Sequence, residues 1–326
     1  MKKWQEIGYA VFMGMVLPWL VVSVAVIRME SRGPAAEETR QPSGAAGGET
    51  SSLTALVRRE GGSVEKWDMD EYLTGVVLGE MPAYFEPEAL KAQAVAARTY
   101  AAKAQDTGGK HGDGSVCMDS RCCQAYQDPD GYLSSGGSPE DVTKIRQAVE
   151  DTSGYVLTYD GELIEAVYFS CSGGSTEDAA AVWGTEVPYL QATDSPGEEN
   201  AAHNTDSVTF TAAQFQEALG RSLAGDPESW FGEVTYTDGG GVAEMEIGRE
   251  SYTGVRLRQL LGLRSTAFTI TAEGGSVRVD TRGYGHRVGM SQYGADAMAA
   301  AGSTFREILS HYYSGTTLEI WGNSTE

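Results

Sequence analysis

The chain has 326 residues, which suffices for one large domain or two modest ones. Its 46 acidic residues outnumber 24 basic ones, and the formal net charge of −22 would repel nucleic acid, so we discount DNA and RNA as partners. Four cysteines are few for a disulfide-stabilised scaffold, and the core must therefore come from apolar packing.

The N-terminal segment has the features of a membrane anchor. Residues 7–27 carry no charge and are long enough to cross a bilayer, and Lys2 and Lys3 precede them. Because basic residues stay on the cytoplasmic side, we expect a single-pass protein of the cell membrane. Residues 1–29 would form a cytoplasmic tip and a transmembrane helix, with the C-terminal domain extracytoplasmic. A cleaved signal peptide is the alternative, disfavoured because no small-x-small cleavage site follows the apolar run.

A flexible linker is predicted next. Residues 30–52 are rich in Glu, Gly, Ala, Pro and Ser, and would hold the folded part away from the membrane. Residues 53–326 form the predicted extracytoplasmic domain. Its first elements are two short strands, residues 53–58 and 63–67, joined by a turn at the glycines between them.

A single carboxylate, Glu80, lies between an apolar run at residues 75–79 and Pro82. A helix over residues 87–105 follows, with Pro87 near its first position and acidic residues in its first turn, as helix N-termini favour. We expect Glu80 to occupy a short connection between apolar structure and this rigid helix. Such a place would hold the carboxyl group fixed and partly desolvated, where its pKa can rise for acid catalysis.

The predicted helix itself is rich in alanine and apolar over a broad arc, which indicates burial with other backbone packed close to it. Lys91 and Arg98 fall outside its apolar stripes. We expect both to be solvated or ion-paired. The alternative is that one of them supports Glu80 or contacts a substrate.

A loop rich in Gly, Asp and Ser follows, and it carries a candidate metal site. His111, Cys117 and Cys123 are spaced six residues apart, and one histidine with two cysteines suits tetrahedral zinc. Water, Cys122 or a residue from elsewhere would be the fourth ligand. A disulfide is the alternative, joining Cys117 to either of the adjacent cysteines. We favour zinc because His111 otherwise has no role.

The middle of the chain predicts a helix over residues 141–150 and a hairpin around Asp160-Gly161. The second strand of the hairpin contains Tyr168 and runs into a Ser- and Gly-rich stretch around Ser172. Small residues at the end of a strand bring backbone close to a ligand, although an ordinary turn has the same composition. Ser172 as a catalytic nucleophile is conceivable, but no Gly-x-Ser-x-Gly elbow surrounds it.

Residues 195–280 are expected to be an inserted accessory segment. Its predicted elements are a helix over residues 209–219 capped by Thr209 or Thr211, strands within residues 233–247 interrupted by three glycines, a helix over residues 254–262, and strands at residues 267–271 and 277–280. The fold class is therefore α+β: a mixed helix and antiparallel-strand ectodomain with an inserted segment, behind one transmembrane helix.

The last cluster covers residues 282–295, where three glycines bracket His286 and Ser291 and Gln292 follow. His286 would serve as a general acid or base, a metal ligand or a substrate contact. The equally favoured alternative is that His286 makes only structural hydrogen bonds. His311, on a predicted amphipathic helix, is expected to be structural.

These motifs together resemble the stage II sporulation protein D family, to which the amidase enhancers also belong. The resemblance begins at Gly79-Glu80-Met-Pro and the helix behind it, and covers the chain from residue 53 to the C-terminus. It continues through Cys123-Gln-Ala-Tyr, Ser172-Gly-Gly-x-Thr-Glu177, Val182-Trp-Gly-x-x-x-Pro-Tyr-Leu190, Leu261-Gly-Leu-Arg-Ser-Thr266 and Gly285-His-x-Val-Gly-Met-Ser-Gln-Tyr-Gly294. One departure is Arg287, where the family pattern has a small residue, and we expect it to perturb the site near His286.

The resemblance implies a lytic transglycosylase that acts on peptidoglycan glycan strands already stripped of stem peptides, during engulfment of the forespore. It implies two partners, the amidase stage II sporulation protein P and the membrane protein stage II sporulation protein M. It also implies that Glu80 is catalytic and that His111, Cys117 and Cys123 bind zinc with a mainly structural role.

One carboxyl group suffices for that reaction, whereas ordinary glycosidases use two. The acid protonates the leaving glycosidic oxygen and then, as a base, deprotonates the muramyl C6 hydroxyl, which attacks the anomeric carbon of the same sugar. Glu80 must then be protonated at rest. Tyr168, Ser172, His286 and Gln292 are the candidates for holding the strand or its developing positive charge.

Two other functions remain open at this point. A non-catalytic glycan-binding activator or scaffold of a cell-wall amidase is the first, suggested by the amidase enhancers. A zinc hydrolase is the weaker alternative, because two thiolate ligands are more typical of a structural site.

Overall fold

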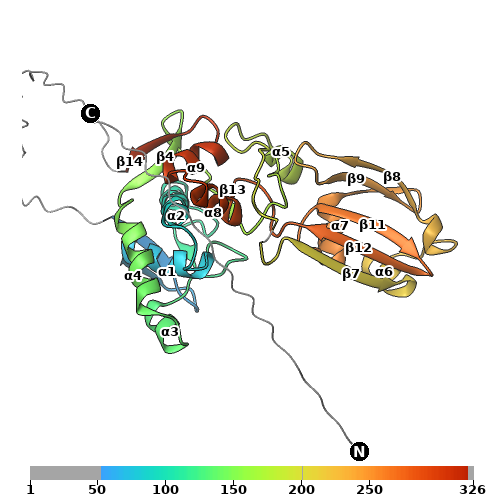
Figure 1. Cartoon of the computed structure of the whole chain (residues 1–326), viewed down its shortest axis with the longest axis horizontal. Coiled ribbons are helices and arrows are strands. Elements are labelled where there is room, and N and C mark those ends of the chain that lie inside the picture. The colour runs from blue at the N-terminus through green and yellow to red at the C-terminus, as the bar shows by residue number, and fades with distance from the viewer. Residues whose placement is uncertain (1–52, 200, 322–326) are drawn as a thin grey trace, which may run out of the picture. The chain divides into compact units, whose positions relative to one another are not determined.

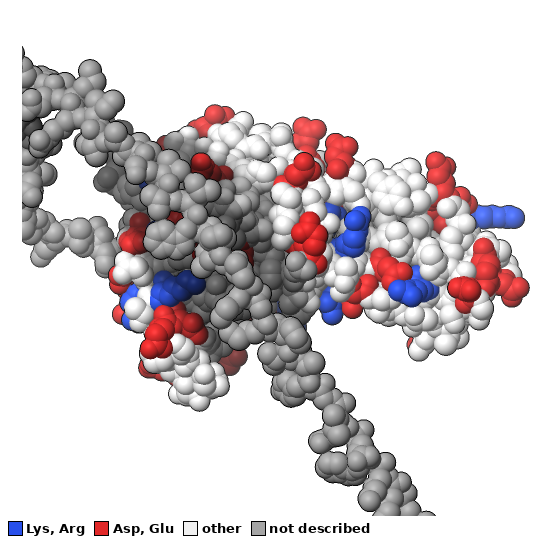
Figure 2. Space-filling model, in the orientation of Figure 1, with Lys and Arg blue, Asp and Glu red and all other residues white. Residues whose placement is uncertain are grey.

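The computed structural model describes residues 53–199 and 201–321, which fold as a mixture of helices and strands, so the α+β class is confirmed (Figure 1). The predicted membrane anchor and linker lie outside the described residues. Within the described ranges, no helix is both long and apolar enough to cross a bilayer. Acidic side chains are scattered across the face drawn in Figure 2, in keeping with the net charge of −22.

The first strands form the predicted hairpin. β1 (Thr54–Arg58) and β2 (Val64–Asp68) pair antiparallel. β3 (Val116–Cys117) joins β1 in parallel, and β13 (Met290–Ser291) pairs in parallel with β6 (Tyr168–Phe169). The expectation of antiparallel strands is therefore wrong for these two pairs, because long excursions of the chain return each second strand in the same direction.

Glu80 is the last residue of a helix, α1 (Met69–Glu80), so the expected short connection is corrected. The side chain of Asp68 accepts hydrogen bonds from the backbone N–H groups of Asp70 and Glu71, and these two acidic residues occupy the first turn. A side-chain cap and negative charge at the N-terminus stabilise a helix there despite its valines and glycines.

The long helix α2 (Pro87–Thr107) is the centre of the main core, as its composition predicts. It begins with Pro87 and ends at Gly108, which adopts the left-handed conformation. The elements packed against it include α1, β1, α4 (Pro139–Glu150), β4 (Tyr155–Tyr159), α8 (Gln292–Ala300) and α9 (Phe305–Tyr312) (Figure 1). Its alanines let these elements approach closely, and most of the helix is buried.

Arg98 is ion-paired, which is one of the two expected outcomes, and it is not solvated. Its side chain is fully buried, where it forms an ion pair with Asp70 at 3.0 Å and donates to the carbonyl groups of Val149 and Thr152. Lys91 forms the ion pairs expected of it, with Glu88 and Asp151. Arg98 thus ties α1 and the end of α4 to α2, and it makes no contact with Glu80.

The predicted hairpin around Asp160-Gly161 is present, but its second strand is shorter than expected. β4 pairs antiparallel with β5 (Glu162–Leu163) and with β14 (Thr317–Ile320). The chain then leaves this sheet, and Tyr168 belongs to β6 instead. Two short helices complete this part of the molecule, α3 (Pro129–Ser134) and α5 (Ala179–Trp183).

A second hydrophobic core lies within the segment expected to be accessory. Its buried side chains include Phe215, Trp230, Leu257 and Val279. They are enclosed by two three-stranded sheets and two helices: β7 (Thr205–Thr211), α6 (Ala212–Leu219), β8 (Phe231–Tyr236), β9 (Val242–Ile247), β10 (Glu250–Thr253), α7 (Gly254–Leu261), β11 (Ala267–Glu273) and β12 (Ser276–Arg282), with a 3-10 turn at Pro227–Ser229. Thr211, not Thr209, caps α6, because residues 205–211 are a strand.

Candidate functional site

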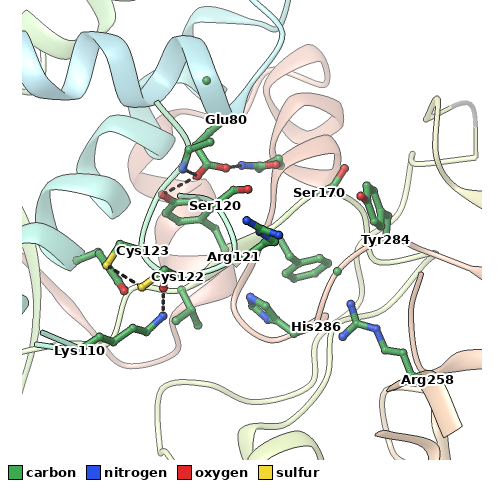
Figure 3. Close-up of a pocket in the computed structure, with 18 residues that line it drawn as sticks. Glu80, Lys110, Ser120, Arg121, Cys122, Cys123, Ser170, Arg258, Tyr284 and His286 are labelled. Atoms are coloured by element: carbon green, nitrogen blue, oxygen red, sulfur yellow. Dashed lines mark hydrogen bonds between the residues drawn. The ribbon is translucent and has the colours of Figure 1, made fainter. Parts of the chain in front are cut away.

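A cleft of about 640 Å³ opens beside the C-terminal end of α1, a size typical of ligand-binding sites (Figure 3). The residues that line it come from α1, α2, the loop at residues 110–125, residues 167–170 around β6, the segment at residues 284–292 and α7. Glu80 is the only carboxylate among the described residues that line this cleft. Tyr168, His286 and Gln292, three of the four predicted substrate contacts, also line it.

Three hydrogen-bond donors surround the half-buried carboxyl group of Glu80. The backbone N–H of Ala125 donates to Oε1 at 2.6 Å, and the hydroxyl group of Tyr168 donates to the same oxygen at 3.5 Å. The side-chain amide of Gln292 donates to Oε2 at 3.2 Å. The structure therefore brings Tyr168 and Gln292 to Glu80 from distant parts of the chain, and the carboxyl group is held in a defined orientation.

Burial raises the pKa of Glu80 above its usual value, and the hydrogen bonds from Ala125, Gln292 and Tyr168 offset part of this rise. Burial acts this way because a low dielectric disfavours the charged form. No lysine or arginine contributes to the shift. Glu80 thus has the environment of a general acid, with a carboxyl group that holds its proton to higher pH than an exposed one.

Two glycines let the loop at residues 124–127 reach Glu80. A Cβ atom on Gly75 would collide with the ring of Tyr126, and one on Gly79 would lie 2.8 Å from the backbone nitrogen of Tyr126. The backbone N–H of Gln127 donates to the carbonyl group of Gly75 at 2.9 Å. Glycines four residues apart lie on one face of a helix, and this spacing was the available sequence signal for the close approach of Ala125.

A buried chain of hydrogen bonds supports Tyr168. The hydroxyl group of Tyr72 donates to Oε1 of Gln124 at 3.0 Å, and Nε2 of Gln124 donates to the hydroxyl oxygen of Tyr168 at 2.9 Å. Since the Tyr168 oxygen accepts from Gln124, its own proton is directed toward Glu80. Tyr72 and Gln124 are fully buried and were missed in the sequence, because nothing local indicates that residues so far apart meet.

The predicted metal ligands come together, and Cys122 joins them. One donor atom from each of His111, Cys117, Cys122 and Cys123 lies within 4.8 Å of every other. Nε2 of His111 is 3.5 Å from Sγ of Cys123 and 3.8 Å from Sγ of Cys122, and the two Sγ atoms are 3.9 Å apart. Zn–S bonds of about 2.3 Å in a tetrahedron place sulfur atoms about 3.8 Å apart, so these residues fit a zinc ion.

The cysteines do not form the alternative disulfide. All four cysteines of the chain lie in the described residues and are free thiols. Cys117 is not bonded to Cys122 or Cys123, the two partners that the alternative offers. The sulfur atoms of Cys122 and Cys123 are 3.9 Å apart, also well beyond the length of about 2.05 Å of a disulfide bond. The donor set of three thiols and one imidazole is that of a closed structural zinc site.

His286 lies in the cleft (Figure 3). Its ring packs against the rings of Phe169 and Trp183, with ring centroids 5.5 and 5.6 Å away. Burial and the positive charges of Arg258 and Lys110 lower its pKa to about 4, so the imidazole is neutral at pH 7. Its Nδ1 accepts a hydrogen bond from the backbone N–H of Val288 at 3.2 Å, which leaves the proton of the neutral ring on Nε2.

Ser172 does not line the cleft, which corrects its prediction as a substrate contact. It is fully buried, and its hydroxyl and backbone N–H groups donate to Oε2 of Glu198 at 2.9 and 2.6 Å. Glu198 also accepts from Ser195 and Ser291, so it binds several segments of the core together. Ser170, two residues earlier, lines the cleft instead.

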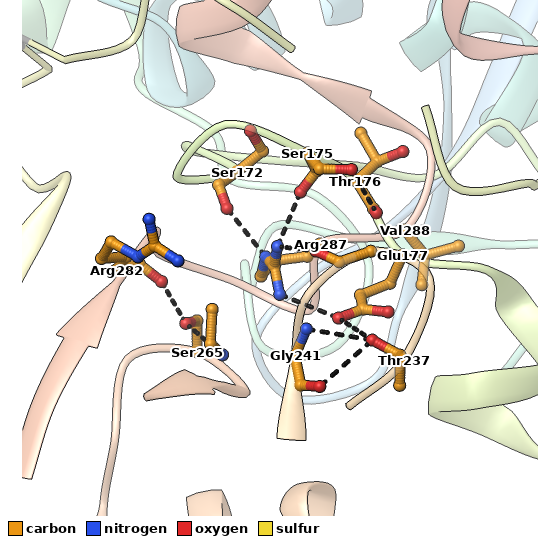
Figure 4. Close-up of polar contacts among 12 residues, drawn as sticks. Ser172, Ser175, Thr176, Glu177, Thr237, Gly241, Ser265, Arg282, Arg287 and Val288 are labelled. Carbon is orange, nitrogen blue, oxygen red and sulfur yellow. Dashed lines mark hydrogen bonds and ion pairs between the residues drawn. The ribbon is translucent and has the colours of Figure 1, made fainter. Parts of the chain in front are cut away.

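Arg287 has a structural role in a set of polar contacts that includes Glu177 and Ser175 (Figure 4), and it does not line the cleft. Its guanidinium group is buried, forms an ion pair with Glu177 at 2.8 Å, and donates to the carbonyl groups of Ser175 and Gly239. Gly239 lies in the turn between β8 and β9 of the accessory segment. The departure from the family pattern at this position therefore links the main core to the accessory segment.

Comparison with known proteins places this arrangement in a family. Residues 58–159 match the family model described as SpoIID, stage II sporulation protein. The chain is 37% identical to stage II sporulation protein D of Bacillus amyloliquefaciens, over 93% of this chain and 90% of that protein. It is 41% identical to stage II sporulation protein D of Bacillus subtilis, over 78% of this chain and 76% of that protein. An amidase enhancer of Bacillus subtilis is 30% identical over 76% of this chain and 40% of its own length. The chain therefore belongs to the stage II sporulation protein D family, a family of sporulation proteins.

Proposed function

We propose that this protein is a lytic transglycosylase that cleaves peptidoglycan glycan strands, denuded of stem peptides, to 1,6-anhydro-muramyl ends during sporulation engulfment. The observation that carries the proposal is the position of Glu80. It is the one carboxylate among the described residues that line the cleft, and burial raises its pKa. Glycosidases that hydrolyse with water need a second carboxylate about 5–9.5 Å away, which the described lining residues do not provide.

In the proposed reaction, protonated Glu80 donates its proton to the glycosidic oxygen as the C1–O bond breaks. The resulting carboxylate then takes the proton of the C6 hydroxyl group, while the oxygen of that hydroxyl group forms the new bond to C1 of the same sugar. Glu80 ends in the state in which it began, and no water is consumed. The hydrogen bonds from Ala125 and Gln292 stabilise the carboxylate between the two steps, when it carries charge.

The metal-binding residues have a supporting role in this proposal. Zinc bound by His111, Cys117, Cys122 and Cys123 would cross-link the loop that ends at Ala125, two residues beyond the last ligand. Four protein ligands leave no open position for a substrate, so the ion would supply structure and no chemistry at the glycosidic bond. The loop so fixed presents the Ala125 N–H to Glu80 at 2.6 Å.

The position in the cell is part of the proposal. The uncharged residues 7–27 behind Lys2 and Lys3 would anchor the chain in the cell membrane with its N-terminus cytoplasmic and the cleft at the septal peptidoglycan. There it would work with stage II sporulation proteins P and M.

A second candidate is a non-catalytic activator of a cell-wall amidase, favoured by the relative named amidase enhancer. Glu80→Gln tests the two against each other, because the amide has nearly the same shape and cannot donate the catalytic proton. The transglycosylase predicts anhydro-muramyl products from denuded peptidoglycan with the wild type and none with the variant, while the variant still binds glycan. If the wild type releases no such product and the variant stimulates an amidase fully, the activator is the correct function.

A further inference from the structure

The charge of the cleft is opposite to that of the chain. Three basic residues line it, Lys110, Arg121 and Arg258, against the single acidic residue Glu80 (Figure 3). In the whole chain 46 acidic residues outnumber 24 basic ones. A cation-lined cleft attracts anionic ligands, which the rest of so acidic a surface repels. This contrast indicates a ligand that carries negative charge.

Two of these cations have no carboxylate partner among the described residues. Nε of Arg258 donates to the carbonyl group of Leu263 at 3.3 Å, and Nζ of Lys110 donates to the carbonyl group of Cys122. Arg121 differs, because Asp119 pairs with it at 3.2 Å. Lys110 and Arg258 therefore bring positive charge to the cleft that no described carboxylate pairs with, and Arg258 comes from α7 of the accessory segment.

The cations act on one end of the cleft. Both Lys110 and Arg258 lower the pKa of His286, and neither contributes to that of Glu80. In Figure 3 they are drawn on either side of His286, apart from the Glu80 carboxyl group. The end at Glu80 thus keeps its acid protonated, and the end at His286 is suited to an anion.

We propose that Lys110 and Arg258, with Arg121 at the edge, bind the free lactyl carboxylate of the muramyl residue. This inference rests on the proposed function and deepens it. The lactyl group sits on C3 of the same sugar ring whose C1 and C6 react, so its charge falls within one ring of the broken bond. While a stem peptide is attached, this carboxyl group is a neutral amide. Its release by an amidase exposes a carboxylate, and charge-assisted hydrogen bonds to it are about twice as strong as those to an amide.

The proposal explains substrate choice by charge and gives the accessory segment a role in it. Arg258 would bind the carboxylate that is exposed when the stem peptide is removed. A strand that still carries peptides would lack this anion, and its peptides would clash with α7. The sugar backbone of the strand is uncharged and is the same with or without stem peptides, so contacts to it would not distinguish good substrates from poor ones.

The test compares two glycans that differ only in charge. Denuded strands are used as they are or after amidation of their lactyl carboxylates with methylamine, and binding to the full chain carrying Glu80→Gln is measured by calorimetry, so that turnover plays no part. We expect the charged strands to bind about tenfold to a hundredfold more tightly, with an advantage that shrinks as salt is raised. Arg258→Gln should remove most of this advantage without weakening binding of the amidated strands, and Arg258→Lys should keep part of it.

Arg256→Gln is the matched control, since Arg256 is an exposed residue of the same helix that does not line the cleft. It should leave the preference intact. Equal binding of charged and amidated strands, or a preference that survives Arg258→Gln in a variant whose melting temperature is unchanged, would overturn the proposal. If Arg258→Gln lowers the melting temperature, Arg258→Lys is the deciding variant. Loss of the preference for charged strands in Arg258→Lys, which retains the positive charge, would also contradict the proposal. Absence of anhydro products from the wild type would refute the transglycosylase alone, because the binding comparison does not depend on cleavage.

Discussion

Gly79→Ala tests whether the close packing of the loop on α1 positions the acid. The added Cβ would lie 2.8 Å from the backbone nitrogen of Tyr126 and 2.9 Å from its Cα, where ordinary contact begins at 3.4 Å. Relief requires the loop to move by about 0.6 Å, and forcing such an atom into a packed interface costs about 1–3 kcal/mol of unfolding free energy. The same movement would lengthen the 2.6 Å bond from Ala125 to Glu80.

Two measurements follow from this geometry. Because the bond from Ala125 lowers the pKa of Glu80, weakening it should raise that pKa further above its usual value. Denaturant unfolding measures the loss of stability, and a carbon-13 NMR titration of the Glu80 carboxyl group measures the pKa without relying on turnover. Gly131→Ala is the control, since a Cβ there meets nothing closer than 3.4 Å, and its effect should stay within about 0.5 kcal/mol. If Gly79→Ala is as stable as the wild type and Glu80 titrates unchanged, the loop does not position the acid.

Three further predictions concern the acid, the metal and the buried ion pair. Burial raises the pKa of Glu80 in the folded state, so wild-type stability falls as pH rises from the unfolded-state pKa of about 4.3 through the folded-state pKa. In thermal unfolding, the stability of Glu80→Gln relative to the wild type should therefore be greater at pH 8 than at pH 4. Equal stability differences at the two pH values would contradict the burial of Glu80. Purified protein should contain one zinc ion per chain by elemental analysis, with Cys122→Ser losing zinc affinity and melting earlier; full zinc content in that variant would exclude Cys122 as a ligand. Arg287→Met leaves Glu177 buried without its partner and should lower the free energy of unfolding by about 3–5 kcal/mol, measured by denaturant unfolding. Replacing both residues with apolar ones should cost less. An unchanged unfolding midpoint for Arg287→Met would show that the pair is not buried in solution.

The elements that the sequence predicts well are those with local signals. Pro87 and Gly108 bound α2, Thr211 and Gly220 bound α6, and Gly262 ends α7 where a left-handed residue is needed. These residues act through the conformation of their own backbone, so their effect is visible without knowing the fold. The His/Cys spacing that predicts the zinc ligands is local in the same sense.

The contacts that were missed depend on the tertiary fold. α1 was not predicted as a helix because its valines and glycines have low helix propensity, and the Asp68 cap and packing against α2 and α4 outweigh that preference. Arg98 is buried because carbonyl groups at the end of α4 lie over it, which the pattern of its own helix does not reveal.

The site shows the same division. Glu80 and Gln292 were predicted from short motifs and Tyr168 from its place on a predicted strand, and the structure brings Tyr168 and Gln292 within hydrogen-bonding distance of Glu80. Ala125 lies in the Cys123-Gln-Ala-Tyr motif, but it acts through its backbone N–H, which the motif does not reveal. Arg258 reaches the cleft from the accessory segment, where no motif indicates a role for it. The charge of the cleft became visible only when residues from several segments were placed together.

The central claim is that Glu80 transfers the proton in a reaction that consumes no water. Its most direct test is mass spectrometry of denuded peptidoglycan digested in ¹⁸O-labelled water by the wild type and by Glu80→Gln. We predict 1,6-anhydro-muramyl ends without ¹⁸O from the wild type and none from the variant. Labelled reducing ends from the wild type, or anhydro ends in equal yield from the variant, would contradict the account.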